Sequence, residues 1–477
     1  MMNPRSALFS ALCIVALSSL AGCAEAVTGN PSPPFVLEPE KKPAELFGYH
    51  PDYTRNIPGF DSENRPYIRS RSTHIHETEF IHTLRDGEWV ERDLIGPLKE
   101  AYPDFRETVY AGGLVEPRVT FDDEDRSYTF VVIRLEDGSR PHLLLYSTDY
   151  WKTVSMVELP ANTRPVEHRA GHNELPGPPF LMVRERYDDH PDRWARLHNL
   201  YVLQPYWDGD EIVVPEPVMV SDMLVALGQH SGGSPFAATL NGKTHFFWAE
   251  VTGEEDAEES PTFGATYDHD TGEVSEPVFV APNRPANNSH NMPGVVFDSE
   301  GYLHVVTGAH HGQSFYYSRS LEANTIDAGW TDPVPVLADG WIAVSGEERG
   351  GQTYVSLVCD PDDTLHLVFR HWRTGIEDYP HLADAERDQF AGLAYQRKRK
   401  GEDWSEETLL VVPERAIYSI FNQRLAVDRT GRLYLSFSYL DRTLREISNE
   451  HRFYSRMVLV SPDGGESWMP AETRHFE

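Results

Sequence analysis

Four side chains with complementary proton chemistry flank two consecutive predicted hairpins. His290 and His310 stand at the two ends of one hairpin, and Tyr354 and Arg370 stand at the two ends of the next. The two ends of a hairpin lie at the same edge of a sheet, so each pair is expected to meet there. If the two hairpins are neighbours in the fold, two imidazoles, a phenol and a guanidinium share one site.

This combination suits β-elimination from a uronic acid. A guanidinium can bind the carboxylate through two hydrogen bonds and draw charge from it, which acidifies the adjacent C5 proton. A neutral imidazole, with an ordinary pKa of about 6.5, can accept that proton, and a phenol, with a pKa of about 10, can protonate the departing oxygen. Glycoside hydrolysis usually needs two carboxylates, and residue type cannot single out such a pair among 75 acidic side chains.

The elements that must position these side chains repeat along the chain. Acidic or Asn-Gly turns recur at intervals of about 60 residues, with one interval of twice that length: Asp61–Asn64, Asp122–Asp125, Asn241–Gly242, Asp298–Gly301, Asp360–Asp363 and Asp428–Gly431. Each turn is followed by an apolar, alternating strand: Pro66–Ile68, Tyr128–Val132, Thr244–Trp248, Leu303–Val306, Leu365–Phe369 and Leu433–Phe437.

The double interval contains one further unit. Gly171–Pro176 supplies its turn and Phe180–Val183 its strand. Seven units result, and no long amphipathic helix interrupts them. The sequence therefore predicts an all-β protein, a seven-bladed β-propeller, in which closure of the ring removes exposed sheet edges.

A turn near the C-terminus carries a folding signal of its own. Ser461–Trp468 resembles the Asp-box turn of sialidase-like propellers, in which Asp and Ser side chains bind the turn's own amides and the Trp fills the space between strands. Ser147–Trp151 resembles a degenerate copy. We expect both segments to stabilise the fold and assign them no chemistry.

The N-terminal residues indicate export. Arg5 precedes an apolar stretch, Ala7–Leu20, that is short for a membrane span, and the sequence up to Cys23 resembles a bacterial lipobox. We expect residues 1–22 to be a lipoprotein signal, residues 23–45 a Pro-rich tether with Cys23 lipidated, and residues 46–477 the propeller. A plain secretory signal is the alternative. Ala24 favours the outer membrane, so the predicted protein is periplasmic or surface-exposed and contacts the membrane through its lipid anchor alone.

Charge and cysteine content limit the partners. The net charge of −33 disfavours nucleic acid and means that an anionic ligand needs a local cluster of Arg or His. Only Cys359 remains as a thiol beyond the predicted signal and lipidated residue, so no intrachain disulfide is expected.

His172, His230 and His371 could line the propeller axis as substrate or metal contacts. No His/Cys spacing is typical of a zinc site. We predict no cofactor and no metal site, leave a structural cation such as calcium open, and expect a monomer.

One block of the sequence resembles a known family. It runs His290-Asn291-x-Pro293, Asp298-x-x-Gly301-Tyr302-Leu303-His304-Val305, Gly308-x-His310 and Phe315-x-Tyr317-x-x-Ser320. This block resembles the BNR-type seven-bladed propeller lyases, which include ulvan lyases and rhamnose–glucuronate lyases. Tyr354 and Arg370 follow at the interval found in that family.

The resemblance implies roles for these residues. His290 and Tyr354 would transfer protons, Arg370 would neutralise the uronate, and His310 would support or share the role of base. Neighbouring polar residues are expected to bind substrate: Asn291, Gln352, His371 and Arg373. The implied substrate is an anionic polysaccharide with rhamnose–glucuronic acid linkages, such as ulvan. Two alternatives stay open: a propeller α-L-rhamnosidase that hydrolyses the same linkage, and a non-catalytic glycan-binding propeller lipoprotein.

Overall fold

The computed structural model describes residues 33–37, 57–71, 79–109, 118–186, 198–225, 227, 232–254, 256–310, 313–337, 351–373, 378–382, 389–413, 420–440 and 454–477. All of them belong to the compact unit Ser32–Glu477. The predicted signal, Cys23 and His230 lie outside the described residues. Among the described residues, no helix has the length and apolar character needed to cross a bilayer.

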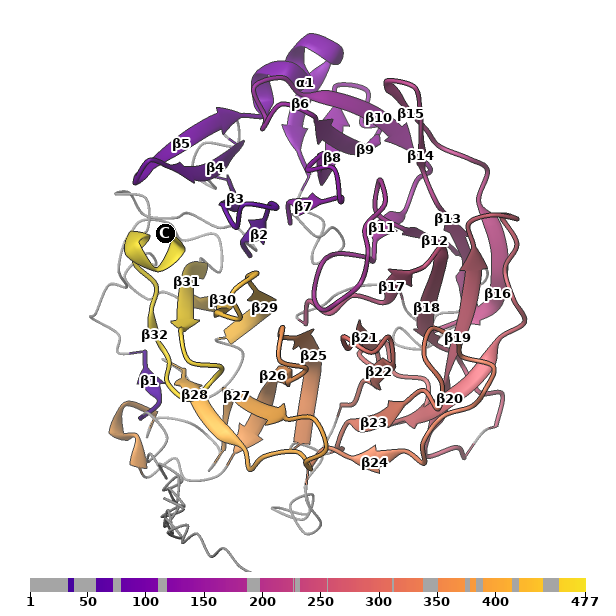
Figure 1. Cartoon of the computed structure of the whole chain (residues 1–477), viewed down its shortest axis with the longest axis vertical. Coiled ribbons are helices and arrows are strands. Elements are labelled where there is room, and N and C mark those ends of the chain that lie inside the picture. Colours follow the sequence, from indigo (N-terminus) through magenta and orange to yellow (C-terminus); the bar gives the residue numbers. More distant parts are fainter. Residues whose placement is uncertain are drawn as a thin grey trace, which may run out of the picture. The chain divides into compact units, whose positions relative to one another are not determined.

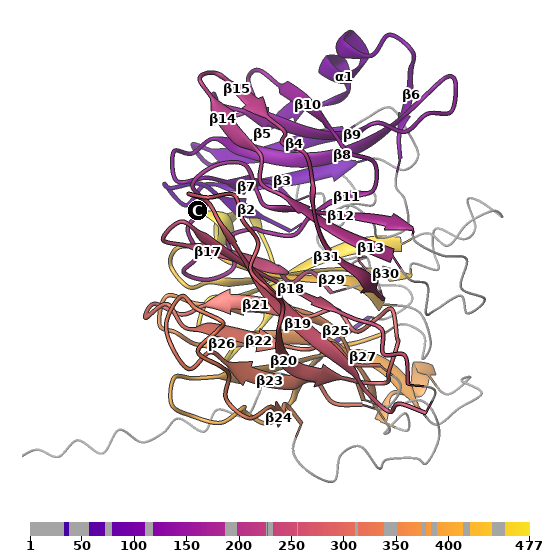
Figure 2. The ribbon, with the colours of Figure 1, turned by 90° about the vertical axis from the view of Figure 1, so that its right-hand side faces the viewer.

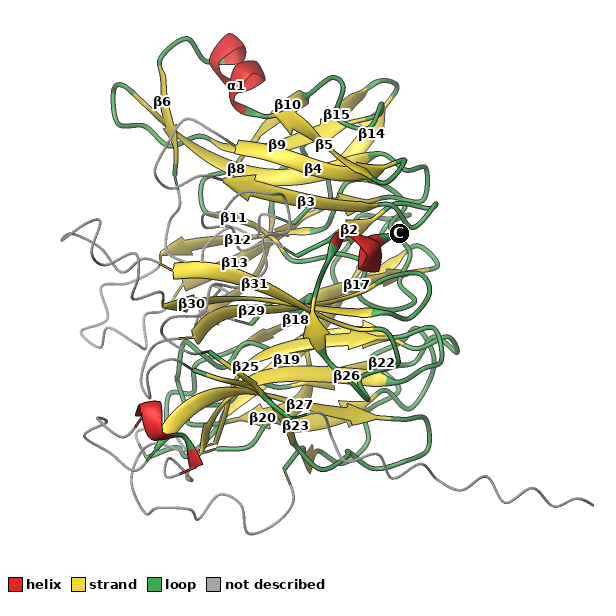
Figure 3. Ribbon diagram, turned by 90° about the vertical axis from the view of Figure 1, so that its left-hand side faces the viewer, coloured by secondary structure: helices red, strands yellow, loops and turns green. Residues whose placement is uncertain are grey.

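The compact unit is a seven-bladed β-propeller, as the repeat predicts. Seven sheets, each built around antiparallel strands, follow one another around a central axis, and the first of these strands in each blade lies nearest to that axis (Figure 1). The short helical segments lie outside the sheets (Figures 2 and 3).

The strands of each blade are consecutive in sequence. Blade one contains β2 (Gly59–Phe60), β3 (Pro66–Arg71), β4 (Glu79–Arg85) and β5 (Glu88–Asp93). Blade two contains β7 (Thr120–Phe121), β8 (Ser127–Leu135), β9 (His142–Ser147) and β10 (Ser155–Leu159), and β6 (Phe105–Thr108) also pairs with β8. Blade three contains β11 (Thr163–Pro165), β12 (Leu181–Arg186), β13 (His198–Leu203) and β16 (Val218–Leu224), with the hairpin β14 (Tyr206–Asp208) and β15 (Glu211–Val213). Blade four contains β17 (Ala237–Leu240), β18 (Lys243–Ala249), β19 (Ser260–Asp268) and β20 (Val278–Asn283).

The last three blades follow the same order. Blade five contains β21 (Gly294–Phe297), β22 (Leu303–Val306), β23 (Tyr316–Arg319) and β24 (Val334–Pro335). Blade six contains β25 (Gly351–Cys359), β26 (Leu365–Arg373), β27 (Phe390–Lys398) and β28 (Thr408–Val412). Blade seven contains β29 (Ile420–Val427), β30 (Leu433–Leu440), β31 (Tyr454–Ser461) and β32 (Met469–Pro470). β1 (Phe35–Val36) adds a parallel fifth strand to blade six. Within the described residues, the helical segments are α1 (Ile95–Ala101), η2 (Pro380–Leu382) and η4 (Thr473–Phe476).

The turn between the first two strands is held by its own aspartate in five blades. The residues that share this pattern are Asp61, Asp122, Asp298, Asp360 and Asp428. In blade six, Oδ1 of Asp360 accepts the backbone N–H groups of Asp362 at 2.9 Å and Thr364 at 2.8 Å. The other carboxylate oxygen contacts the side chain six positions later, which is Tyr67, Tyr128, His304, His366 or Tyr434. The carboxylate thus satisfies amides that a tight turn leaves exposed.

The same turns connect neighbouring blades. The backbone N–H and the hydroxyl of Ser299 donate to the two carboxylate oxygens of Asp363, both at 2.7 Å, and so join blades five and six. The backbone N–H of Arg429 donates to the Asn64 side chain at 2.8 Å and joins blade seven to blade one. Among the described strands, none is shared between the first and last blades, so side-chain contacts join these two blades.

Aromatic packing completes this closure. Phe60 of blade one lies 5.2 Å from Tyr434 of blade seven, measured between ring centroids. Phe476, at the C-terminus, lies 5.0 Å from Tyr434 and 5.5 Å from Trp89. The first and last blades thus share one apolar cluster.

The third unit differs from the prediction in its turn. Gly171–Pro176 is not a hairpin turn but belongs to a long loop, residues 166–180, which we call the crossing loop. Its Ala170 carbonyl accepts the backbone N–H of Cys359 at 2.7 Å, and the N–H of His172 donates to the carbonyl of Phe297 at 3.3 Å. The loop thereby ties blade three to blades five and six.

Gly171 permits this approach. A Cβ atom at Gly171 would lie 2.7 Å from the carbonyl oxygen of Phe297, closer than a side chain can come. Such a contact between distant blades leaves no periodic signal in the sequence.

Both predicted Asp-box turns have the expected contacts. The Ser461 hydroxyl accepts the N–H of Gly465 at 2.8 Å, and the Asp463 carboxylate accepts the N–H of Ser467 at 2.9 Å. In the copy, the Ser147 hydroxyl accepts the N–H of Trp151, whose side chain is buried. These segments stabilise turns between outer strands.

The crossing loop begins beside a buried carboxyl group, that of Glu167. Its two oxygens accept hydrogen bonds from the Thr239 hydroxyl and from the N–H of Phe180. Burial raises the pKa of Glu167 from 4.5 to about 7. The folded state therefore binds a proton there that the unfolded state has already released at intermediate pH.

We predict that the Glu167 carboxyl group makes the free energy of unfolding decrease as pH rises from about 4.5 to about 7. Relative to Glu167→Gln, the wild-type free energy of unfolding should decrease by up to about 3 kcal/mol across that window and then stay level. Urea unfolding at several pH values measures this difference. Glu211→Gln, at an exposed position of β15, should keep the wild-type profile; parallel profiles for wild type and Glu167→Gln would contradict the assignment.

Candidate active site

The structure brings the four predicted side chains together between blades five and six. His290 precedes β21 and His310 follows β22, while Tyr354 lies on β25 and Arg370 on β26. The Asp turns join the opposite ends of these strand pairs. The group therefore lies at the edge of the two blades away from the Asp turns.

The four side chains form a continuous row. The imidazoles of His290 and His310 stack, with centroids 4.0 Å apart and an interplanar angle of 5°. The Tyr354 ring lies 5.5 Å from that of His290 at 49°, and the Arg370 guanidinium carbon lies 4.6 Å from the centre of the Tyr354 ring. His290, Tyr354 and Arg370 are largely buried, whereas His310 is partly exposed.

Asn288 determines which ring nitrogen carries the proton in each of the two imidazoles. Its Oδ1 accepts the backbone N–H of His290 at 2.9 Å, which fixes the orientation of the amide. The same oxygen lies 2.6 Å from Nδ1 of His290, so Nδ1 carries the proton and Nε2 the lone pair. The amide nitrogen faces Nδ1 of His310 at 3.4 Å and favours the opposite tautomer there.

Asn291 and Gly308 hold the loop that presents His290. The Asn291 amide donates to Oδ1 of Asn283 and to the carbonyl of Pro285, both at 2.6 Å. A Cβ atom at Gly308 would lie 2.4 Å from the Asn291 carbonyl carbon, so the loop can pack this closely only over glycine. Asn291, predicted to bind substrate, is thus fully buried in an internal contact.

Tyr354 has an unusual backbone conformation. Its φ angle is +68°, in the left-handed region that a bulky residue rarely adopts. It lies within an irregularity in the pairing of β25 with β26, between Thr353 and Ser356. Blade seven has a similar irregularity at Asn422, a residue type that tolerates this region better. Strain of about 1–3 kcal/mol at a tyrosine is typical of functional sites.

Arg370 lies between two aromatic side chains. Its guanidinium carbon is 4.6 Å from the Tyr354 ring centre and 5.9 Å from that of Trp372, and the side chain is 2% exposed. Residues two apart on a strand share a face, so Trp372 was within reach of sequence reasoning, which overlooked it. The aromatic faces hold the planar guanidinium in one orientation.

Three other residues predicted to bind substrate have internal contacts. His371 and Arg373, on the opposite face of β26 from Arg370, both contact Glu407. Burial lowers the pKa of His371 in spite of that carboxylate. The Gln352 side chain accepts the N–H of Phe315 at 2.8 Å within the core. Their roles in substrate binding stay predictions.

Comparison with known proteins adds a family match. Residues 256–476 match the model of a BNR repeat-containing family. The matched segment contains the whole row of four. No curated protein has a sequence that matches this chain.

Several solved structures resemble the chain at low sequence identity. One is an ulvan lyase of a new polysaccharide lyase family, bound to -[GlcA(1-4)Rha3S]- (9% identity, 91% of this chain and 99% of that chain, TM-score 0.46). Another is a protein of unknown function from Dyadobacter fermentans (11% identity, 90% and 98%, TM-score 0.38). A third is a sialidase from Trypanosoma rangeli (11% identity, 88% and 59%, TM-score 0.36). Likenesses at this level do not establish a shared activity.

We predict that Asn288→Ala removes the tautomer preference of His290. Without Oδ1 as acceptor, His290 should shift toward the Nε2–H form that neutral imidazole ordinarily prefers. Nitrogen-15 NMR of histidine-labelled protein, with signals assigned through His290→Gln and His310→Gln, reports which ring nitrogen is protonated. An unchanged Nδ1–H signal for His290 in the variant would show that another group sets the tautomer.

Proposed function

We propose that the protein is a polysaccharide lyase that cleaves next to a uronic acid by β-elimination. The observation that carries this proposal is the continuous row of imidazole, imidazole, phenol and guanidinium from two neighbouring blades. The row includes no carboxylate, whereas glycoside hydrolysis usually uses two.

Arg370 would bind the carboxylate of the uronate. Its guanidinium offers paired N–H donors in a fixed plane, and bidentate binding stabilises the charge that develops when the C5 proton leaves. The net charge of −33 repels an anionic polymer at long range. Recognition would therefore depend on this local cation.

His290 would act as base and Tyr354 as acid. Nε2 of His290, which carries the lone pair, takes the C5 proton, and the electrons of the C5–H bond form the C4=C5 double bond. The C4–O4 bond breaks, and the leaving oxygen takes the phenolic proton of Tyr354. His310, stacked on His290, supports the imidazole in its position.

The placement of these two groups suits glucuronate. In a D-glucuronate ring, the C5 hydrogen and the O4 substituent lie on the same side of the ring, so base and acid must approach from one side. His290 and Tyr354 are adjacent, with ring centroids 5.5 Å apart. Two groups on opposite sides of the sugar would suit the epimer, iduronate.

The sequence resemblance supports the choice of substrate. The block around His290 and His310 resembles that of propeller lyases acting on rhamnose–glucuronic acid linkages, so an ulvan-like polysaccharide is the substrate we propose. We also propose that the protein is a monomeric lipoprotein, exported and anchored through Cys23. An enzyme held at the cell surface or in the periplasm would meet such a polymer outside the cytoplasm.

We predict that the protein converts ulvan to products with an unsaturated uronate at the new non-reducing end. The double bond conjugated to the carboxylate absorbs in the ultraviolet, so absorbance should rise together with reducing ends. Reducing ends without absorbance would indicate hydrolysis, as in the rhamnosidase alternative. Binding with neither signal would indicate a glycan-binding propeller; either result would overturn the proposed reaction.

We predict that lyase activity falls when one of these four side chains is replaced. Tyr354→Phe keeps the ring but loses the proton, so kcat should fall by about 100-fold or more. Arg370→Lys keeps the charge but loses paired binding, and Arg370→Ala should reduce activity further. Arg399→Ala, which removes an exposed ion pair with Glu466, is the matched control and should be fully active. Full activity of Arg370→Ala, with the wild-type circular dichroism spectrum, would contradict this mechanism.

A further inference from the structure

One imidazole, one thiol and one carboxylate gather where the crossing loop meets the end of β25. Candidate ligand atoms of His172, Cys359 and Asp363 all lie within 4.8 Å of one another. Nε2 of His172 lies 3.3 Å from Oδ1 of Asp363. We propose that these three side chains bind a transition-metal cation, with Zn²⁺ the best match to their chemistry.

One of the three ligand spacings matches that of a tetrahedral site, and the three ligand atoms all lie within 4.8 Å of one another. With metal–ligand distances of about 2.0 Å to nitrogen or oxygen and about 2.3 Å to sulfur, neighbouring ligand atoms lie roughly 3.3–3.8 Å apart. The pair His172–Asp363 already has this separation. The carbonyl oxygen of Asp360 lies 3.0 Å from Nε2 of His172 and 3.7 Å from the Cys359 sulfur, and can supply a fourth ligand.

The types of ligand select the cation. Thiolate and imidazole favour Zn²⁺ and similar metals, whereas Ca²⁺ and Mg²⁺ prefer sites made of oxygen alone. The Asp363 carboxylate is held in place by the backbone N–H and hydroxyl of Ser299 and by Lys400. Metal sites commonly orient their carboxylates through such outer contacts.

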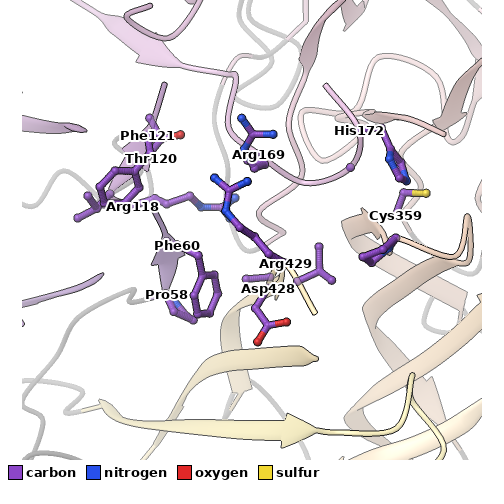
Figure 4. A pocket seen from close by; sticks show the side chains of 16 residues that line it. Pro58, Phe60, Arg118, Thr120, Phe121, Arg169, His172, Cys359, Asp428 and Arg429 are labelled. Carbon is purple, nitrogen blue, oxygen red and sulfur yellow. The ribbon is translucent and has the colours of Figure 1, made fainter. Parts of the chain in front are cut away.

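The site is reachable from a cavity of about 200 Å³ on the Asp-turn side of the propeller. His172 and Cys359 lie together at one end of this cavity, while Arg118, Arg169 and Arg429 lie toward the other (Figure 4). Two of the three ligand side chains therefore line a space from which a cation can approach the site.

The backbone brings the ligands together without help from a cation. The Ala170 carbonyl accepts the N–H of Cys359, and the N–H of His172 donates to Phe297. The loop from blade three thus carries its imidazole to the thiol and carboxylate of blade six. A bound metal would cross-link these blades, a role independent of the proposed lyase activity.

The test uses the full chain carrying Cys13→Ser and Cys23→Ser, so that Cys359 is its sole thiol. After treatment with a chelator, this protein is titrated with Co²⁺, which reports thiolate ligation through a charge-transfer band, and then with Zn²⁺ in competition. One equivalent should bind. Cys359→Ser should lose the charge-transfer band. His172→Gln and Asp363→Asn should each weaken Zn²⁺ binding, and the affinity of His172→Gln should fall by more than about 100-fold.

His269→Gln changes a histidine that is hydrogen-bonded to Thr244, and serves as the matched control. Its affinity for Zn²⁺ should equal that of the parent. Zn²⁺ should also raise the Tm of the parent but not that of His172→Gln. Absence of a charge-transfer band in the folded parent, or wild-type affinity in His172→Gln, would refute the site.

Discussion

A single carboxylate in each Asp turn is the contact on which this structure depends. The aspartate binds the amides of its own turn and a side chain of the following strand, so the inner hairpin has one conformation. Its neighbours then join the turn to the next blade, as Ser299 joins Asp363 and Arg429 joins Asn64. These contacts link neighbouring blades at one side of the ring. The far ends of the same hairpins lie at the other side.

The candidate active site lies at the ends of the hairpins away from the Asp turns. Rigid hairpins deliver His290, His310, Tyr354 and Arg370 to one edge, but their final geometry comes from local irregularities. Asn288 assigns the protons of the two imidazoles, and the positive φ of Tyr354 turns its ring between His290 and Arg370. Such strain costs about 1–3 kcal/mol and persists only where the surrounding structure fixes the conformation.

β25 connects the two ends of the molecule. Tyr354 lies near its start, and Cys359 ends it beside His172 of the crossing loop. A metal at that end would hold the same inner strand that carries the phenol at the other. The proposed metal site and the proposed active site thus use one strand but separate chemistry, and each stands without the other.

The order of residues was enough to predict the repeat and the hairpins of most blades, although it misplaced the turn of the third. The spacing of Asp turns and alternating strands is local chemistry, so the order of residues alone is enough to count seven blades and to pair His290 with His310. Trp372 and Asn288 were within reach of the same reasoning, since strand alternation places the first and an Asn two residues before His290 suggests the second.

Contacts between segments far apart in the sequence became visible in the folded chain alone. Gln352, His371 and Arg373 have types that suit substrate binding, yet strand pairing places them against internal partners. His172 and Cys359 are far apart in sequence, and their meeting depends on a loop that crosses from blade three to blade six. Turn and strand signals extend over a few residues. The contacts of His371 and Arg373 with Glu407 depend on how the strands of one blade pair, and the meeting of His172 with Cys359 depends on the packing of distant blades, so no short segment encodes either.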